Sequence, residues 1–197
     1  MISIDTLLAW GAAYKKVGRN EIIFREDSES HFYYQLVSGS VRWVNINEEG
    51  KEFIQEMVEP GESFGELPLF DESSYAASAI ANTDSVIIRL HKLTFLNLLK
   101  EYPEIHFAFT RLMTERLRFK FLLLKELSCF GPEHRISTLL THLKGSKKKD
   151  DLNKFQIQLT RQEIANMTGL RVETVIRSIR HLQDQGALVI NKGKVYC

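Results

Sequence analysis

The feature that most limits the possible folds of this chain is a run of 25 residues, 104–128, that contains neither glycine nor proline. Such a run predicts one long helix, and Pro103 directly before it is tolerated in a first helical turn. Apolar residues cover more than one face of this helix, so each of these faces needs a partner that buries it. The two apolar stripes are Phe109, Met113, Leu117, Phe121 and Leu124, and Ile105, Leu112, Phe119 and Leu123.

One face of the helix can pack on a domain of the same chain. The other face provides a seam for a second copy of the helix, which would give a two-fold dimer. We predict that the dimer seam is the stripe that runs from Phe109 to Leu124. The alternative is that both faces pack within a single chain.

The segment before the helix is rich in strand-forming residues. Short apolar runs alternate there with turn residues such as Ser38-Gly39-Ser40 and Glu59-Pro60-Gly61. Short runs at a spacing of about 8 to 12 residues predict antiparallel strands in a sandwich or barrel. The runs are 21–24, 32–37, 41–47, 53–58 and 85–90.

The charge divides unevenly at Gly131-Pro132, which ends the helical run. Residues 1–130 hold 14 Lys and Arg against 19 Asp and Glu, a net charge of −5, whereas residues 131–197 hold 12 against 6, a net charge of +6. A basic module joined to an acidic one favours binding of a polyanion by the basic module, although Lys147-Lys148-Lys149 is also explained as a solvated loop. We therefore divide the chain into residues 1–103, 104–130 and 131–197.

The composition excludes several classes of protein. With 197 residues, 44% hydrophobic and 26% charged, the chain is neither disordered nor collagen-like. It lacks a run of about 18 apolar residues and a basic lead-in at its N-terminus, so we expect a cytoplasmic protein without a membrane partner. Two cysteines, Cys129 and Cys197, cannot supply a four-cysteine metal or iron-sulfur site, so we expect no metal and no cofactor.

The segment 159–182 has the pattern of a helix-turn-helix. Thr160, followed three residues later by Glu163, is a capping box that starts a helix at Arg161. Gly169 provides a short turn, and a second helix follows from about Val172 to Gln183. Its apolar residues share one face, and its charged residues share the opposite face. The apolar residues are Val175, Ile179 and Leu182, and the charged ones are Glu173, Arg177 and Arg180.

The charged face has the chemistry for reading base edges in a major groove. Arg177 could donate two hydrogen bonds to guanine, Glu173 could accept one from cytosine, and Val172 could contact a thymine methyl. The alternative is that Glu173 and Arg177 form only an exposed ion pair. After the helix, residues 185–196 predict a small hairpin with its turn at Asn191-Lys192-Gly193, a wing that would lie against phosphates.

These motifs together resemble those of one family. The run LTRQEIANMTGLRVETVIRSIRHLQDQGALVINKGKV is similar to the helix-turn-helix of the cyclic AMP receptor protein and fumarate-nitrate regulator (Crp-Fnr) family, and GESFGELPLF, residues 61–70, resembles its cyclic-nucleotide-binding β-roll. The resemblance covers nearly the whole chain. It implies an α+β fold with an N-terminal antiparallel, jelly-roll-like β-roll as sensor, a long dimerisation helix and a C-terminal winged helix-turn-helix.

The resemblance also implies a function, that of a homodimeric transcription regulator that binds double-stranded DNA, with RNA polymerase as a further partner. Glu173 and Arg177 would read the G·C part of each half-site, and Val172 favours a palindrome of the TTGA…TCAA type. Arg171 stands where relatives often carry a Ser or Thr helix cap, so its side chain could instead meet a phosphate. The candidate DNA-binding residues are Thr160, Arg161, Gln162, Arg171, Val172, Glu173, Thr174, Arg177 and Lys192.

The same resemblance raises the question of the effector. In the family the Glu of the GEL motif meets the ribose, and an Arg-Ser pair further along the chain holds the phosphate. Here that pair falls on Tyr75-Ala76 or Ala76-Ala77, which offer no charge, and Pro68 removes one loop N–H. We therefore expect an effector other than cAMP. The candidate effector pocket is Gly65, Glu66, Leu67, Tyr75, Ala76 and Ala77.

Several alternatives stay open or are disfavoured by the residues. A cyclic nucleotide could bind through a non-standard phosphate site, or the chain could respond to another small ligand, to a protein or redox signal, or to none. The iron-sulfur branch of the family needs cysteines near the N-terminus, and none precedes Cys129. An enzyme with a cupin-type metal site needs an H-x-H motif, which is absent from the sequence, so we expect no enzymatic activity.

Overall fold

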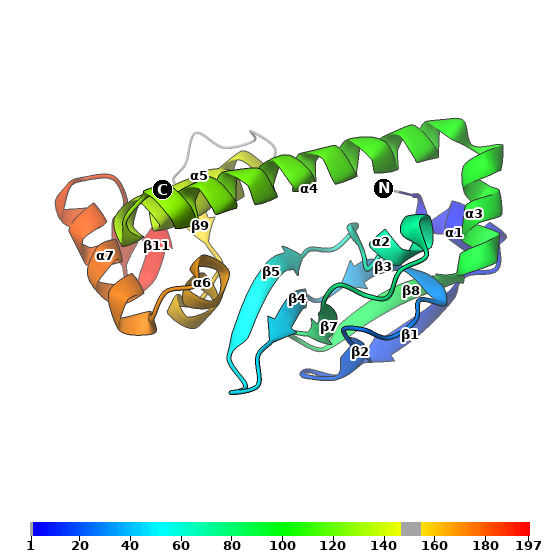
Figure 1. Cartoon of the computed structure of the whole chain (residues 1–197), viewed down its shortest axis with the longest axis horizontal. Coiled ribbons are helices and arrows are strands. Elements are labelled where there is room, and N and C mark those ends of the chain that lie inside the picture. Colours follow the sequence, from blue (N-terminus) through cyan, green and yellow to red (C-terminus); the bar gives the residue numbers. More distant parts are fainter. Residues whose placement is uncertain (1, 147–154) are drawn as a thin grey trace. The chain divides into compact units, whose positions relative to one another are not determined.

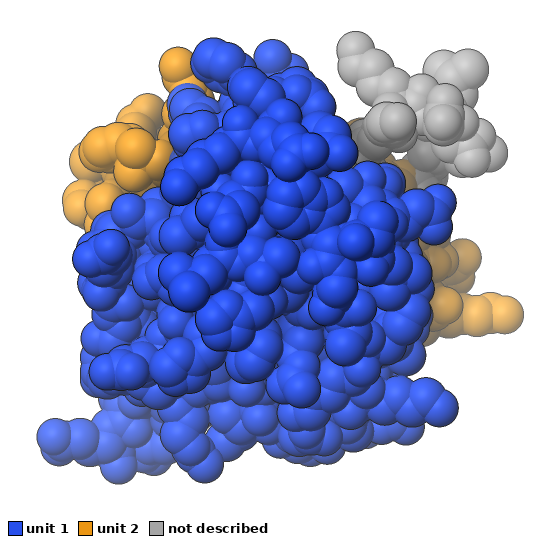
Figure 2. Space-filling view, turned by 90° about the vertical axis from the view of Figure 1, so that its right-hand side faces the viewer, with its two compact units in different colours: residues 1–115 blue, residues 116–197 orange. Residues whose placement is uncertain are grey.

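The computed structural model describes residues 2–146 and 155–197; the run Lys147-Lys148-Lys149 lies outside these residues. The chain forms two compact units, Met1–Glu115 and Arg116–Cys197, which Figure 2 distinguishes by colour. The long helix α4 (Pro103–Cys129) contributes to both units. No helix in the described part of the chain has the length and apolarity that crossing a bilayer requires.

The first unit is built on two four-stranded antiparallel sheets (Figure 1). The antiparallel architecture predicted for the N-terminal domain is confirmed. One sheet has the order β1 (Ala13–Val17), β8 (Ser85–His91), β3 (Phe32–Ser38) and β6 (Ser63–Phe64). The other has the order β2 (Ile22–Phe24), β7 (Ser78–Ala81), β4 (Val41–Ile46) and β5 (Glu52–Val58).

The sheet that contains β8 and β3 is buried on both faces because successive side chains of a strand point to opposite sides. Ile87 belongs to a hydrophobic cluster that both sheets share, whereas the next residue, Ile88, belongs to a cluster formed with the helices. Likewise, Tyr34 belongs to the cluster between the sheets, and its neighbour Tyr33 belongs to the cluster formed with the helices. This sheet therefore joins the interior of the β-roll to the helical layer. The helices of this layer are α1 (Ile4–Ala9), α3 (Lys92–Glu101) and the start of α4, and a short helix, α2 (Leu67–Asp71), follows β6.

The first turns of α4 pack on the β-roll through Phe109. This side chain is 2% exposed, and its ring meets the rings of Tyr33 and Phe95 edge-on, with centroids 5.8 and 5.4 Å away. The predicted seam therefore differs from the structure at its first residue, because the packing of the helix on the sheet turns Phe109 inward. Met113 is half-buried. The other three predicted seam residues, Leu117, Phe121 and Leu124, are exposed.

The second unit holds three helices and a small sheet beside the end of α4. The helices α5, α6 and α7 contact one another pairwise, and the strands form a sheet of order β10-β11-β9. Strand β9 extends the two-stranded wing by a third strand. The elements are α5 (Pro132–Ser146), β9 (Gln156–Ile157), α6 (Arg161–Thr168), α7 (Val172–Asp184), β10 (Val189–Asn191) and β11 (Lys194–Tyr196).

Side chains on both sides of the corner fix how α4 passes into α5. Arg135 of α5 donates hydrogen bonds to the carbonyl oxygens of Phe130 and Leu127, at 3.0 and 2.9 Å. The Leu127 carbonyl is among the last four of α4 and the Phe130 carbonyl lies just beyond its end, so neither has a partner within the helix. The imidazole of His134 bonds the carboxylate of Glu126 at 2.5 Å, and its ring stacks on Phe130 with centroids 4.1 Å apart.

Replacing His134 tests how much the contacts between α4 and α5 contribute to the free energy of unfolding. In His134→Ala the Glu126 carboxylate, on a side chain only 4% exposed, loses its imidazole partner. We expect the free energy of unfolding to fall by about 1–3 kcal/mol, measured by urea denaturation followed by circular dichroism. His31→Ala removes an exposed imidazole and should change it by less than about 0.5 kcal/mol. Equal losses in the two variants would contradict a specific role for His134.

Candidate nucleic-acid interface and effector pocket

The helix α6 begins with the predicted capping box. The Thr160 hydroxyl accepts a hydrogen bond from the Glu163 N–H at 3.1 Å, and the Glu163 carboxylate accepts one from the Thr160 N–H at 2.7 Å. The helix ends at Gly169, which adopts a φ of 69° that a residue with a side chain rarely takes. The N–H of Leu170 then donates to the carbonyl of Ala165 at 3.1 Å. Local interactions therefore fix both ends of the first helix and the turn that follows.

The helix α7 presents the predicted apolar and charged faces. Its buried residues are Val175, Ser178, Ile179 and Leu182. Glu173 and Arg177 are exposed, and neither side chain forms an ion pair, with the other or with any further residue in the described chain. Both side chains are therefore available to bind groups outside the protein. In the alternative, a surface ion pair, each would be bound to the other. Arg171 precedes the helix without capping it through its side chain.

The wing forms a tight hairpin whose turn is the predicted one. Lys192 and Gly193 both have positive φ, 47° and 78°, as a two-residue hairpin turn of this twist requires. Lys192 is exposed at the tip. Arg161, a predicted DNA contact, is half-buried and donates from Nη2 to the carbonyl of Gly193 at 3.4 Å, so it also ties α6 to the wing. Burial lowers the pKa of the Arg161 guanidinium.

The structure gathers the nine candidate DNA-binding residues on three neighbouring pieces of the second unit. These are the start of α6, the start of α7 and the tip of the wing. Gln162 donates to Asn166 at 2.8 Å, and Val172 and Thr174 are half-buried. Arg180, which lies on the charged face but was not among the candidates, is exposed about one turn beyond Arg177.

A second long-range hydrogen bond, which the sequence analysis did not predict, connects α7 to α5. The imidazole of His181 bonds the Glu133 carboxylate at 2.7 Å and so connects the last turn of α7 to the first turn of α5. Residues 48 positions apart form this bond, so no spacing rule could have found it.

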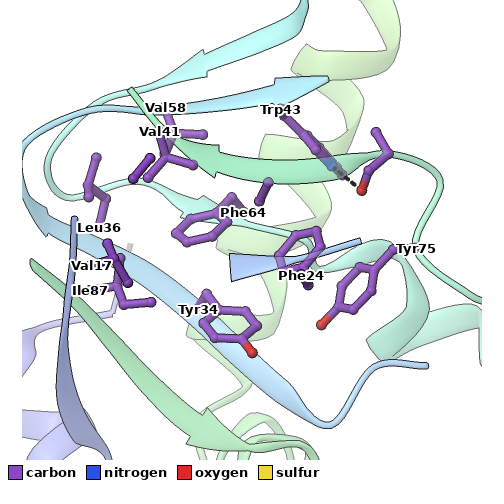
Figure 3. Close-up of a cluster of buried hydrophobic side chains, with 13 residues drawn as sticks. Val17, Phe24, Tyr34, Leu36, Val41, Trp43, Val58, Phe64, Tyr75 and Ile87 are labelled. Carbon is purple, nitrogen blue, oxygen red and sulfur yellow. Dashed lines mark hydrogen bonds between the residues drawn. The ribbon is translucent and has the colours of Figure 1, made fainter. Parts of the chain in front are cut away.

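Tyr75, one of the candidate effector-binding residues, belongs to a stack of aromatic rings inside the β-roll (Figure 3). Phe24 and Tyr75 stack almost parallel, with ring centroids 3.7 Å apart and an interplanar angle of 10°. A Cβ atom added to Gly65 would lie 2.5 Å from the Phe24 ring, so this ring closes directly on the glycine of the GEL motif. Tyr34 and Phe64 continue the stack.

The other predicted pocket residues serve the fold. Glu66 is fully buried, and Ser63 donates to its carboxylate at 3.5 Å. The carbonyl of Ala77 accepts from the Trp43 indole at 3.2 Å, and that of Ala76 accepts from Asn45 at 2.8 Å. At positions 75 to 77 no side chain carries a charge. No group of three or more His, Cys, Asp or Glu side chains within residues 2–146 and 155–197 is placed to hold a metal ion.

The fold and these sites define a class of protein, a winged-helix DNA-binding protein with an N-terminal β-roll. Comparison with known families agrees, since residues 14–102 match the cyclic nucleotide-binding domain and residues 134–196 match the Crp-like helix-turn-helix domain. The chain belongs to the Crp-Fnr family of transcription regulators.

Individual relatives span most of the chain. The cAMP-activated global transcriptional regulator CRP of Haemophilus influenzae is 29% identical over 187 residues, which cover 94% of this chain and 83% of that protein. The cyclic AMP receptor protein of Thermus thermophilus is 30% identical over 173 residues, which cover 88% of this chain and 78% of that protein. The structure of FixK2 from Bradyrhizobium japonicum, 22% identical, has a TM-score of 0.79 and covers 94% of this chain and 91% of that one, and thus shows the same fold.

Alkaline titration tests the burial of Tyr75. Burial raises the pKa of this phenol from about 10 to about 12, and the nearby Ser30 hydroxyl opposes the shift. Between these pH values the unfolded chain loses the proton before the folded one does, so the stabilisation is complete below pH 10 and disappears as the pH approaches 12. Over this range we expect the free energy of unfolding of wild type to fall by about 1–2 kcal/mol more than that of Tyr75→Phe, measured by urea denaturation at each pH. Tyr14→Phe, at an exposed position, should leave the alkaline loss unchanged.

Proposed function

We propose that the chain regulates transcription as a homodimer that binds a palindromic DNA site of the TTGA…TCAA type. The observation that carries this proposal is the exposed face at the start of α7, where Glu173 and Arg177 have no ion-pair partner in the described chain. One helical turn of about 6 Å separates them, and stacked base pairs are about 3.4 Å apart, so the two side chains reach neighbouring base pairs. Val172 stands at the helix start, where a thymine methyl can meet it.

Substitution of Arg177 tests the assignment of a base contact. Arg177→Ala should lose about 1–3 kcal/mol of binding free energy on a TTGA…TCAA duplex and relax the preference at one G·C pair, because a bidentate contact to guanine is removed. Lys192→Ala should weaken binding evenly on all sequences, because a wing lysine meets phosphates. The measurements are fluorescence anisotropy titration and selection of sites from random DNA. An equal loss for Arg177→Ala on specific and random DNA would contradict base reading by Arg177.

The proposed dimer uses the exposed stripe of α4. Phe107 is 76% exposed and Phe121 64% exposed, and Leu117 and Leu124 are also exposed, whereas Phe109 is committed to the β-roll. These four exposed residues and the polar Thr110 and Thr114 occupy positions 107, 110, 114, 117, 121 and 124, which alternate steps of three and four, the spacing of a two-helix seam. A second copy of the helix would bury these apolar side chains, and two basic reading units would then serve the two halves of a palindrome.

A charged residue in the seam tests the dimer. Phe121→Asp should shift the chain from dimer to monomer in sedimentation equilibrium and abolish the advantage of a palindrome over a single half-site, because two carboxylates would face each other in an apolar seam. Ala108→Asp introduces the same charge at an exposed position of α4 outside this spacing and should leave the dimer intact. A Phe121→Asp protein that remains dimeric would contradict the assignment of the seam.

We also propose that the effector is not cAMP. The support is the uncharged stretch at positions 75 to 77 and the Phe24 ring against Gly65. The second candidate is a cyclic-nucleotide-responsive regulator with a non-standard phosphate site, and it is favoured by the names of the relatives, which are cAMP-activated or cyclic AMP receptor proteins. As a regulator rather than an enzyme, the protein would meet its DNA and RNA polymerase in the cytoplasm.

A further inference from the structure

Three hydroxyl groups and one guanidinium gather at one end of the aromatic stack in the β-roll. Tyr34 on β3 pairs in register with Arg89 on β8, and Figure 3 shows the hydroxyls of Tyr34 and Tyr75 directed to the same side of the stack. Ser30 lies close to the Tyr75 hydroxyl. We refer to Ser30, Tyr34, Tyr75 and Arg89 as the hydroxyl-arginine cluster.

The hydroxyls of this cluster have unused hydrogen-bonding capacity. Ser30 is 9% exposed, and its Oγ has no hydrogen-bond partner among the described residues. The Tyr34 hydroxyl, on a buried side chain, makes no hydrogen bond to another described residue, and the Tyr75 hydroxyl has only the Ser30 hydroxyl as a neighbour within bonding reach. Leaving a buried polar atom such as Ser30 Oγ without a partner costs free energy, so this end of the stack points to a partner that the chain itself does not provide.

Arg89 brings a positive charge to the same end of the roll. It alternates with Ile88 and Leu90, which face the helices, and therefore shares the side of Ile87 that faces the aromatic stack. Its guanidinium lies 4.8 Å from the centre of the Phe32 ring and has no carboxylate partner in the described chain. The charge also acts on Tyr34, where it opposes the rise in pKa caused by burial.

We propose that the hydroxyl-arginine cluster binds the oxyanion group, a carboxylate or a phosphate, of a small molecule. Arg89 supplies the charge and the forked donors that such groups prefer, and the three hydroxyls complete the set of donors. Because the stacked rings fill the roll behind the cluster, the body of the ligand must be small or lie outside. The positive charge thus comes from β8 and not from positions 75 to 77, where the family resemblance places it.

The test is calorimetric titration of the full chain at constant ionic strength with sodium phosphate, sodium benzoate and cAMP. Saturable binding of phosphate or benzoate is expected, and the stronger of the two identifies the source of the oxyanion. Tyr75→Phe keeps the stacked ring and removes only the hydroxyl, and Arg89→Gln removes the charge. Each variant should weaken binding roughly tenfold or more, because each removes a charged or charge-assisted contact.

Arg19→Gln is the matched control. It removes the same charge from the turn at the other end of β8, where Arg19 donates its backbone N–H to Asp84, and it should bind as wild type does. The proposal is overturned if neither anion binds saturably at millimolar concentration, or if Tyr75→Phe and Arg89→Gln both bind with wild-type affinity. The proposal is also overturned if cAMP binds saturably, neither phosphate nor benzoate does, and both variants bind cAMP as wild type does. That result would favour a nucleotide site at the loop 65–67. Since no DNA is present, failure here would leave the proposed DNA-binding function untouched.

Discussion

The sheet that pairs β8 with β3 supports both halves of the first unit, because each of these strands places alternate side chains in two different cores. Ile87 and Tyr34 enter the aromatic stack of the β-roll, while Ile88 and Tyr33 pack under the helices. The ring of Tyr33 lies parallel to that of Phe95, with centroids 4.6 Å apart, and Phe109 of α4 closes on both edge-on. Two consecutive residues of β3 therefore contact different parts of the first unit: Tyr34 packs in the interior of the β-roll, and Tyr33 packs against the start of α4.

This arrangement has consequences for both proposed activities of the first unit. The inward packing of Phe109 leaves Phe107 exposed within the first unit, and Leu117, Phe121 and Leu124, further along the same helix, are exposed in the second. A ligand at the hydroxyl-arginine cluster would touch Tyr34, whose neighbour Tyr33 supports Phe109. A shift of Tyr34 on binding would thus act on the strand that supports the start of α4, which gives a short physical connection from the ligand to the helix of the proposed dimer.

The second unit shows why some of its site could be predicted and some could not. The capping box of Thr160 and Glu163 and the turn at Gly169 involve residues at most five positions apart, so spacing alone predicted them. The contact of Arg161 with Gly193 and the bond of His181 with Glu133 span 32 and 48 positions. Such contacts depend on how the helices pack, and no local pattern contains them.

Local patterns in the chain predict the order of the parts, the helix-turn-helix with its charged face, and the resemblance to a regulator family, because helix periods, caps and turns are set by interactions between near neighbours. Long-range packing settles which stripe of α4 is buried, that the Phe24 ring contacts Gly65, and that Arg89 pairs with Tyr34 and lies over Phe32. These contacts join strands far apart in the chain, and the pairing register that brings them together follows from packing of the whole β-roll and not from any short segment.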